Sequence, residues 1–114
     1  MQPETATYLR DMLESARAII EYTRGQTERD YLRLRPLRDS VQWNFCVIGE
    51  AMSRLLAFDS TVGSRITDAR KIVDFRNQLI HSYGVINDQI TWNVVESKLP
   101  TLIQELERLL EEVA

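Results

Sequence analysis

Apolar side chains recur three or four residues apart in four separate stretches of this 114-residue chain. The stretches cover residues 4–23, residues 37–56, the segment from 67 to Gly84, and the segment from 91 to 113. This spacing puts the apolar groups on one face of an α-helix, whereas a half-buried strand alternates every second residue. Glycine and proline are scarce, with 4 and 3 copies, so few residues interrupt the pattern. The chain is therefore expected to be all-α.

Four amphipathic helices joined by short connections predict an antiparallel four-helix bundle, and the length suits a single domain over residues 1–114. The pattern also allows a short additional helix near 27–34, and it predicts a loop over 58–66. Gly49 lies inside the second helix, where glycine costs about 1 kcal/mol against alanine. A close crossing with another helix would explain it. Pro100 is expected to kink the last helix, because it removes a backbone donor.

The cysteine count and the lengths of the apolar runs predict where in the cell the protein is located. Cys46 is the single cysteine, so no internal disulfide can form and a reducing cytoplasm is suitable. We interpret Cys46 as a small core residue. The start of the chain has no basic segment followed by an apolar one, and no apolar run approaches the roughly 20 residues that span a bilayer. A cytoplasmic protein without membrane contact is expected.

Charge is unevenly distributed along the sequence. The net charge is −3, yet the segment from Arg24 to Arg38 is rich in arginine and the last ten residues are rich in glutamate. The basic segment has two interpretations, a solvated helix face with local ion pairs or a surface that contacts RNA phosphates. The residues that would make such contacts are Arg29, Arg33, Arg35 and Arg38.

The stretch from 74 to 84 contains the residues suited to catalysis. His81 is the only histidine, and histidine can take or give a proton near neutral pH. Arg76 precedes it by five positions and offers a planar fork of donors for phosphate oxygens. His81 would act as acid or base on a ribose 2′-hydroxyl or leaving oxygen, while Arg76 stabilises the charge on phosphorus oxygens. This chemistry cleaves RNA without metal or cofactor and leaves a 2′,3′-cyclic phosphate.

Helical geometry separates these two side chains. Arg76 and His81 are about 140° apart on an ideal helix, so one straight helix does not point them the same way. A long arginine reach, or a second copy of the helix across a two-fold axis, would complete the site. Asn77 shares a face with His81 and could orient it or simply bond solvent. In the alternative interpretation, His81 only interacts with the helix dipole.

The sequence around these residues resembles a known family. Arg76-Asn77-x-x-x-His81-x-Tyr83 looks like the Arg-x4-His-x-Tyr form of the HEPN motif in HepT-like toxins. The step Gly49-Glu50-Ala51 resembles one that is usual in this family. The resemblance covers residues 5 to 112, and further matching positions are Trp92 and Leu99-Pro100.

The resemblance implies a HEPN helical bundle that forms a homodimer, with Arg76 and His81 of both subunits lining a cleft. It implies a metal-independent endoribonuclease that acts as the toxin of a type VII-like toxin–antitoxin system. The partner would be a minimal nucleotidyltransferase antitoxin of the MntA type, which transfers AMP onto the motif tyrosine, here Tyr83. An added nucleotide would bring negative charge and bulk beside Arg76 and His81.

Two other hypotheses remain. A HEPN dimer could keep these residues and only bind nucleotide, RNA or a nucleotidyltransferase without cutting, although the intact Arg76, His81 and Tyr83 favour the enzyme. A purely structural bundle would require the motif match to be accidental. Trp43 and Trp92 could stack on bases, but the place of Trp92 at the start of a helix favours a packing role.

Overall fold

The computed structural model describes residues 1–82 and 86–112. Within these ranges the chain forms seven helices and no strand, which confirms the all-α prediction. The helices are α1 (Pro3–Thr23), α2 (Glu28–Arg33), α3 (Arg35–Phe58), α4 (Ser60–Gly63), α5 (Ala69–His81), α6 (Asp88–Ser97) and α7 (Leu99–Glu111).

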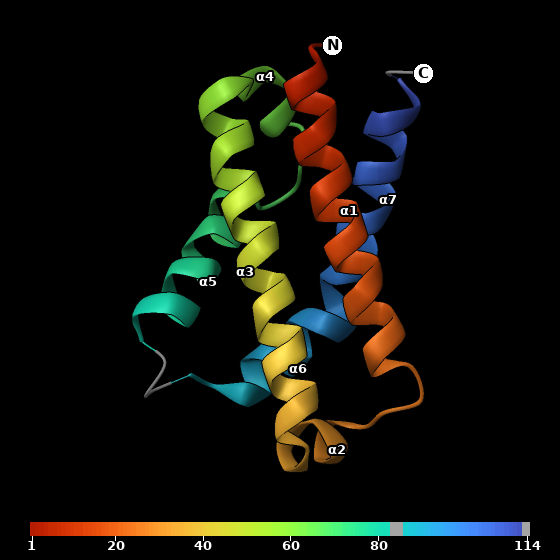
Figure 1. Ribbon diagram of the computed structural model, residues 1–114, viewed down its shortest axis with the longest axis vertical. Helices are drawn as coiled ribbons and strands as arrows, with labels where there is room; N and C mark the ends of the chain where they lie inside the picture. Colours follow the sequence, from red (N-terminus) through yellow and green to blue (C-terminus); the bar gives the residue numbers. More distant parts are fainter. Residues whose placement is uncertain (83–85, 113–114) are drawn as a thin grey trace.

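Helices α1, α3, α5 and α7 form the bundle, and each runs antiparallel to the neighbour it packs on (Figure 1). Helix α3 packs between α1 and α5, and α1 packs between α3 and α7. The short helix α2 packs against α3 and against α6, and α6 crosses behind the lower half of α3 in this view (Figure 1). This arrangement confirms the predicted antiparallel four-helix bundle with a short extra helix.

The core is built from the apolar faces that the spacing predicted. Side chains on α1, α3 and α7 are almost fully removed from solvent, which is the main favourable term in folding. The most deeply buried include Leu9, Met12, Ala16, Ile19, Val41, Ile48, Met52, Leu55, Leu99 and Leu106.

The segment over 27–34 forms a helix because two reciprocal hydrogen bonds between Thr27 and Asp30 cap its first turn. Thr27 Oγ1 accepts from the Asp30 backbone N–H at 3.1 Å, and the Asp30 carboxylate accepts from the Thr27 N–H at 2.9 Å. This capping box satisfies two donors that a helix start leaves free. Hydrogen bonds from Thr27 hold the pKa of Asp30 below its usual range.

Two local predictions need correction. The expected loop over 58–66 contains one helical turn, α4, because Asp59 accepts from the Val62 backbone N–H at 3.2 Å and caps it. The last helix is not kinked inside but divided, with α6 ending before Lys98 and α7 starting after it. Pro100 lies in the first turn of α7, where its missing N–H is not needed.

Helix α6 is anchored by aromatic packing. Trp92 is buried, and its ring lies 5.5 Å from that of Tyr31 between centroids, which supports the packing interpretation of this tryptophan. Tyr31 is completely buried, and its hydroxyl has no hydrogen-bond partner among the described residues. Burial raises the pKa of Tyr31 to about 12, partly offset by the nearby Gln42 and Thr91 side chains.

Replacing Tyr31 with phenylalanine should change the unfolding free energy at pH 7 by less than about 1 kcal/mol, because no hydrogen bond is lost. In alkali the two proteins should differ. The unfolded tyrosine ionises near its ordinary pKa of 10, whereas the buried one stays protonated to about 12, so the wild type loses stability across this window. Urea unfolding at rising pH should show a shallower decline for Tyr31→Phe. Tyr22→Phe, at an exposed tyrosine, is the control, and an equal decline in all three proteins would contradict the assignment.

No helix among the described residues is long and apolar enough to cross a membrane.

Candidate active site

Arg76 lies on the face of α5 that packs against α3, and its side chain is only 17% exposed. The close contact is with Gly49: a Cβ built on that glycine would lie 2.1 Å from Arg76 Cβ and 2.6 Å from Arg76 Cγ. Only a residue without a side chain fits there. The close helix crossing predicted at Gly49 is therefore confirmed, and the helix that it meets is α5.

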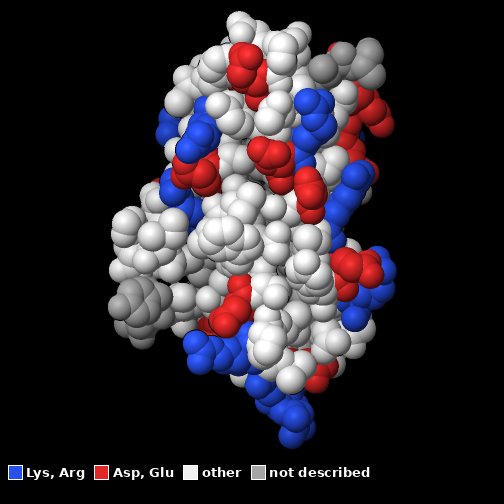
Figure 2. Space-filling view, viewed as in Figure 1, with Lys and Arg blue, Asp and Glu red and all other residues white. Residues whose placement is uncertain are grey.

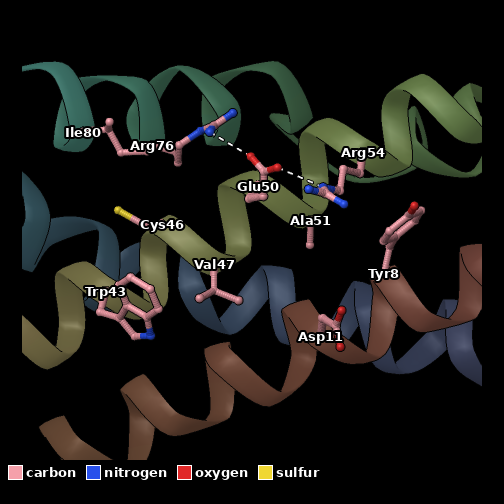
Figure 3. Close-up of a pocket in the computed structure, with 10 residues that line it drawn as sticks. All are labelled: Tyr8, Asp11, Trp43, Cys46, Val47, Glu50, Ala51, Arg54, Arg76 and Ile80. Atoms are coloured by element: carbon pink, nitrogen blue, oxygen red, sulfur yellow. Dashed lines mark hydrogen bonds and ion pairs between the residues drawn. The ribbon is translucent and has the colours of Figure 1, made fainter.

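The tip of Arg76 is held by a carboxylate of α3. Arg76 Nη1 donates to Glu50 Oε2 at 2.8 Å, and Arg54 Nε donates to Glu50 Oε1 at 2.9 Å (Figure 3). The hydrogen bond from Arg54, together with the charge of Arg76, holds the pKa of Glu50 below its usual range. Arg76 Nε is buried and has no acceptor among the described residues, so the protein does not use every donor of this guanidinium.

Arg76 and Glu50 line a groove of about 400 Å³ on the outer side of α3. Side chains of α1 and α5 form its two sides (Figure 3). Trp43 stands at one end of the groove and is 69% exposed. Figure 2 shows a largely uncharged band across the middle of the face formed by α1 and α3. The other lining residues are Tyr8, Asp11, Cys46, Val47, Ala51, Arg54 and Ile80.

His81 is the last residue of α5 and is exposed. It follows Ile80, which lines the groove, but His81 is not among the lining residues. Asn77 is also exposed and makes no hydrogen bond to His81 within the described part of the chain. A single chain thus brings Arg76 to Glu50 and leaves His81 at the helix end. The separation agrees with the angle of about 140° between Arg76 and His81 on an ideal helix. The proposed role of Asn77 stays a prediction.

Tyr83, the candidate for modification, lies outside the described residues. Its proposed role also stays a prediction.

The four arginines predicted to contact phosphate differ in their surroundings. Arg29 and Arg33 are exposed and form no ion pair with described residues, whereas Arg35 pairs with Asp39 at 3.5 Å. Arg38 donates to the carbonyls of Tyr31 and Leu32 and so closes the end of α2. Basic side chains gather at the α2 end of the molecule (Figure 2). That end is distant from Arg76, because about 22 Å of helix separates residues 35 and 50 of α3.

Cys46, predicted to be a small core residue, is partly buried and packs against the core. It also lines the groove, one helical turn before Glu50. Burial raises the pKa of the Cys46 thiol, partly offset by the charge of Arg76. A raised thiol pKa disfavours the reactive thiolate, so Cys46 is unsuited to nucleophilic catalysis at neutral pH.

Sequence reasoning did not include Glu50 and Arg54 in the site, and it considered Trp43 only as a candidate base-stacking residue. The spacing of Glu50 and Arg54, four residues apart on one helix, was a visible signal for a local ion pair. Nothing in the spacing indicated that Glu50 also reaches Arg76, because that contact joins residues 26 positions apart. The exposure of Trp43 likewise depends on how α3 is packed.

The arrangement offers a fixed cation in an open groove and an exposed imidazole at the end of the same helix. No group of three or more metal-ligating side chains occurs among the described residues. Arginine stabilises charge on phosphate oxygens and histidine transfers protons, which are the two requirements for breaking a phosphodiester bond by attack of a neighbouring hydroxyl.

Residues 12–109 of the chain match the family described as "Ribonuclease HepT-like". Among curated proteins, one of Methanocaldococcus jannaschii described as "Gamma-glutamylcyclotransferase and putative RNase" is 31% identical over 113 residues, 99% of this chain. The chain spans only half of that relative's length.

Shorter relatives match over nearly their whole length. A "Putative RNase" of the same organism is 30% identical over 104 residues, which cover 91% of this chain and 94% of the relative. A "Probable ribonuclease HepT" of Thermococcus cleftensis is 28% identical over 102 residues, 90% and 92% of the two chains. No solved structure is significantly similar to this chain.

Proposed function

This chain belongs to the HepT-like ribonuclease family, and we propose that it is a metal-independent endoribonuclease, the toxin of a toxin–antitoxin pair. His81 acts as acid and base, and Arg76 stabilises the negative charge that develops on the phosphorus oxygens. The 2′-hydroxyl of the ribose attacks the adjacent phosphorus, the bond to the 5′-oxygen breaks, and a 2′,3′-cyclic phosphate remains.

One observation carries this proposal. The only histidine of the chain lies at the exposed end of α5, and the arginine five residues before it lies on the same helix in an open groove. Among the described residues, Arg76 makes its side-chain hydrogen bond through Nη1 alone, and an arginine fork matches phosphate oxygens. The proposed acid–base group and the proposed charge-stabilising group thus belong to one helix, five residues apart.

We further propose that the active site is shared between two subunits of a homodimer. On an ideal helix Arg76 and His81 point about 140° apart, which favours a site that a second chain completes. The apolar lining of the groove and the exposed Trp43 supply a surface that a second copy could cover. A two-fold axis near this groove would bring the His81 of one subunit toward the Arg76 of the other.

RNA cleavage by the purified protein in the presence of EDTA tests the function. The wild type should cut RNA and leave cyclic phosphate ends, because neither proposed residue needs a metal. Absence of cleavage would reject the enzyme and favour the non-catalytic HEPN dimer that binds nucleotide, RNA or a nucleotidyltransferase. Cleavage that EDTA abolishes would reject the metal-independent mechanism.

Mixing inactive variants tests whether the site is shared. A mixed dimer of Arg76→Ala and His81→Ala subunits contains one intact site only if each site takes its arginine and histidine from different chains. After subunit exchange, about a quarter of the wild-type activity should return, because half the dimers are mixed and each has one working site of two. No recovery, with exchange verified by mass spectrometry, would place each site within one subunit.

We also propose that a minimal nucleotidyltransferase partner silences the enzyme by transferring AMP to Tyr83. The added phosphate carries negative charge, which would compete with RNA near Arg76 and His81. Incubation with that partner and ATP should add one adenylyl group to the wild type and none to Tyr83→Phe. Inhibition of Tyr83→Phe by the partner without modification would instead indicate that the partner covers the cleft.

A further inference from the structure

We propose that Glu50 is a positioning residue for Arg76, and that Arg54 in turn holds Glu50. The inference rests on the proposed ribonuclease function, since it explains how the charge-stabilising arginine is aimed. Each oxygen of the Glu50 carboxylate accepts from a different arginine, Oε2 from Arg76 at 2.8 Å and Oε1 from Arg54 at 2.9 Å. The carboxylate therefore cannot rotate without breaking both hydrogen bonds.

Arg76 is restrained at both ends of its side chain. Its Cβ and Cγ pack against the bare backbone of Gly49, and its Nη1 is tied to Glu50. An arginine with a free tip would sample many rotamers, and ordering it on substrate binding would cost free energy. A guanidinium that is already ordered avoids this cost at the moment of reaction.

The ion pair is open to solvent on the Glu50 side, where the side chain is 46% exposed. Water around this carboxylate screens the pair and limits its contribution to stability. The chain has a comparable glutamate in Glu112, which is 44% exposed and pairs with Arg65 at 2.7 Å. What distinguishes Glu50 is its partner, because Arg76 is mostly buried, lines the groove and belongs to the proposed site.

The charge of Glu50 allows positioning to be separated from simple electrostatics. A carboxylate next to the RNA path repels phosphate, so removing it should strengthen RNA binding if charge were its only effect. Loss of positioning would instead lower the rate of cleavage, because a poorly aimed Arg76 stabilises the transition state less. The binding effect appears in KM and the positioning effect in kcat.

Steady-state cleavage of a defined RNA oligonucleotide tests this split. Glu50→Ala should lower kcat by about 10- to 100-fold with KM unchanged or lower, because small displacements of a positioned group can cost about 10²-fold. Glu50→Gln keeps one acceptor oxygen, so its kcat should lie between those of the wild type and Glu50→Ala. Glu112→Ala, which breaks the matched ion pair elsewhere, should keep the kcat of the wild type.

Arg54 gives a second test of the same arrangement. Arg54→Ala should lower kcat less than Glu50→Ala does. In this variant Glu50 still accepts the hydrogen bond from Arg76, but Arg54 no longer holds the carboxylate in place. In the Glu50→Ala background the Arg54→Ala change should have no further effect on kcat, since Arg54 acts only through Glu50. Additive losses in the double variant would show independent roles and overturn this part of the proposal.

A measurement that does not depend on RNA cleavage tests the positioning role of Glu50 independently of the proposed ribonuclease function. Relaxation of the ¹⁵Nε–H group of Arg76, measured by NMR, should report a rigid side chain in the wild type and in Glu112→Ala, and a mobile one in Glu50→Ala. If the wild type cuts no RNA, the ribonuclease function fails and this comparison alone decides whether Glu50 restrains Arg76. Unchanged Arg76 mobility, or an unchanged kcat, in Glu50→Ala overturns the proposal.

Discussion

Replacing Arg76 with alanine is expected to lower RNA cleavage by about 10²–10³-fold, because the transition state loses its main charge-stabilising donor. His81→Ala should lower it by about 10²–10⁴-fold through loss of proton transfer. His81 is exposed, so its removal should leave the thermal unfolding midpoint nearly unchanged. Arg76→Lys keeps the charge but not the planar fork, and it should retain intermediate activity.

The chain supplies a matched control for the arginine. Arg70 lies on the same helix as Arg76, is exposed and forms no ion pair with described residues. If Arg70→Ala reduces cleavage as much as Arg76→Ala does, the loss reflects general attraction of RNA to positive charge. Wild-type cleavage by Arg76→Ala or His81→Ala would remove that residue from the catalytic site.

Replacing Gly49 with alanine is expected both to destabilise the protein and to impair cleavage. In an ordinary helix the change would stabilise by about 1 kcal/mol. Here the new Cβ would lie 2.1 Å from Arg76 Cβ, so α5 or the arginine must move. Overpacking of this kind typically costs about 1–3 kcal/mol. Because the displaced atoms belong to Arg76, RNA cleavage should fall as well, by up to about 10²-fold.

Gly63→Ala separates the two effects of the Gly49 change. A Cβ at Gly63 would meet the side chain of Leu56 at 2.8 Å, which can shift, and Gly63 is not among the groove residues. This variant should lose some stability in urea unfolding and keep its cleavage activity. A Gly49→Ala protein that is more stable than the wild type and fully active would contradict the close approach of α3 and α5.

Much of the secondary structure could be predicted because its causes are local. The spacing of Leu9, Met12 and Ile19 defines a buried helix face, whatever that face packs against. Element boundaries were less certain. The turn of α4 depends on the Asp59 cap, and the division between α6 and α7 depends on how the chain accommodates Pro100.

The candidate site was predictable only in part. Arg76 and His81 were proposed because their residue types suit phosphodiester cleavage and because the motif around them resembles that of HepT-like toxins, and the angle between them follows from the helix repeat. The surroundings of each arginine in the basic segment were not predictable. Arg38 closes the end of α2 through contacts with backbone carbonyls, a role that its charge gives no reason to expect.

By itself, the sequence determined the all-α class, the buried faces and the candidate catalytic residues, since these depend on neighbours within one or two helical turns. Tertiary structure alone decided that Gly49 meets Arg76, that Glu50 joins Arg76 to Arg54, and that Cys46 lines a groove. The contacts of Gly49 and Glu50 with Arg76 join α3 to α5 across more than 20 residues of chain. Their geometry depends on the packing of whole helices, which no local pattern of side chains specifies.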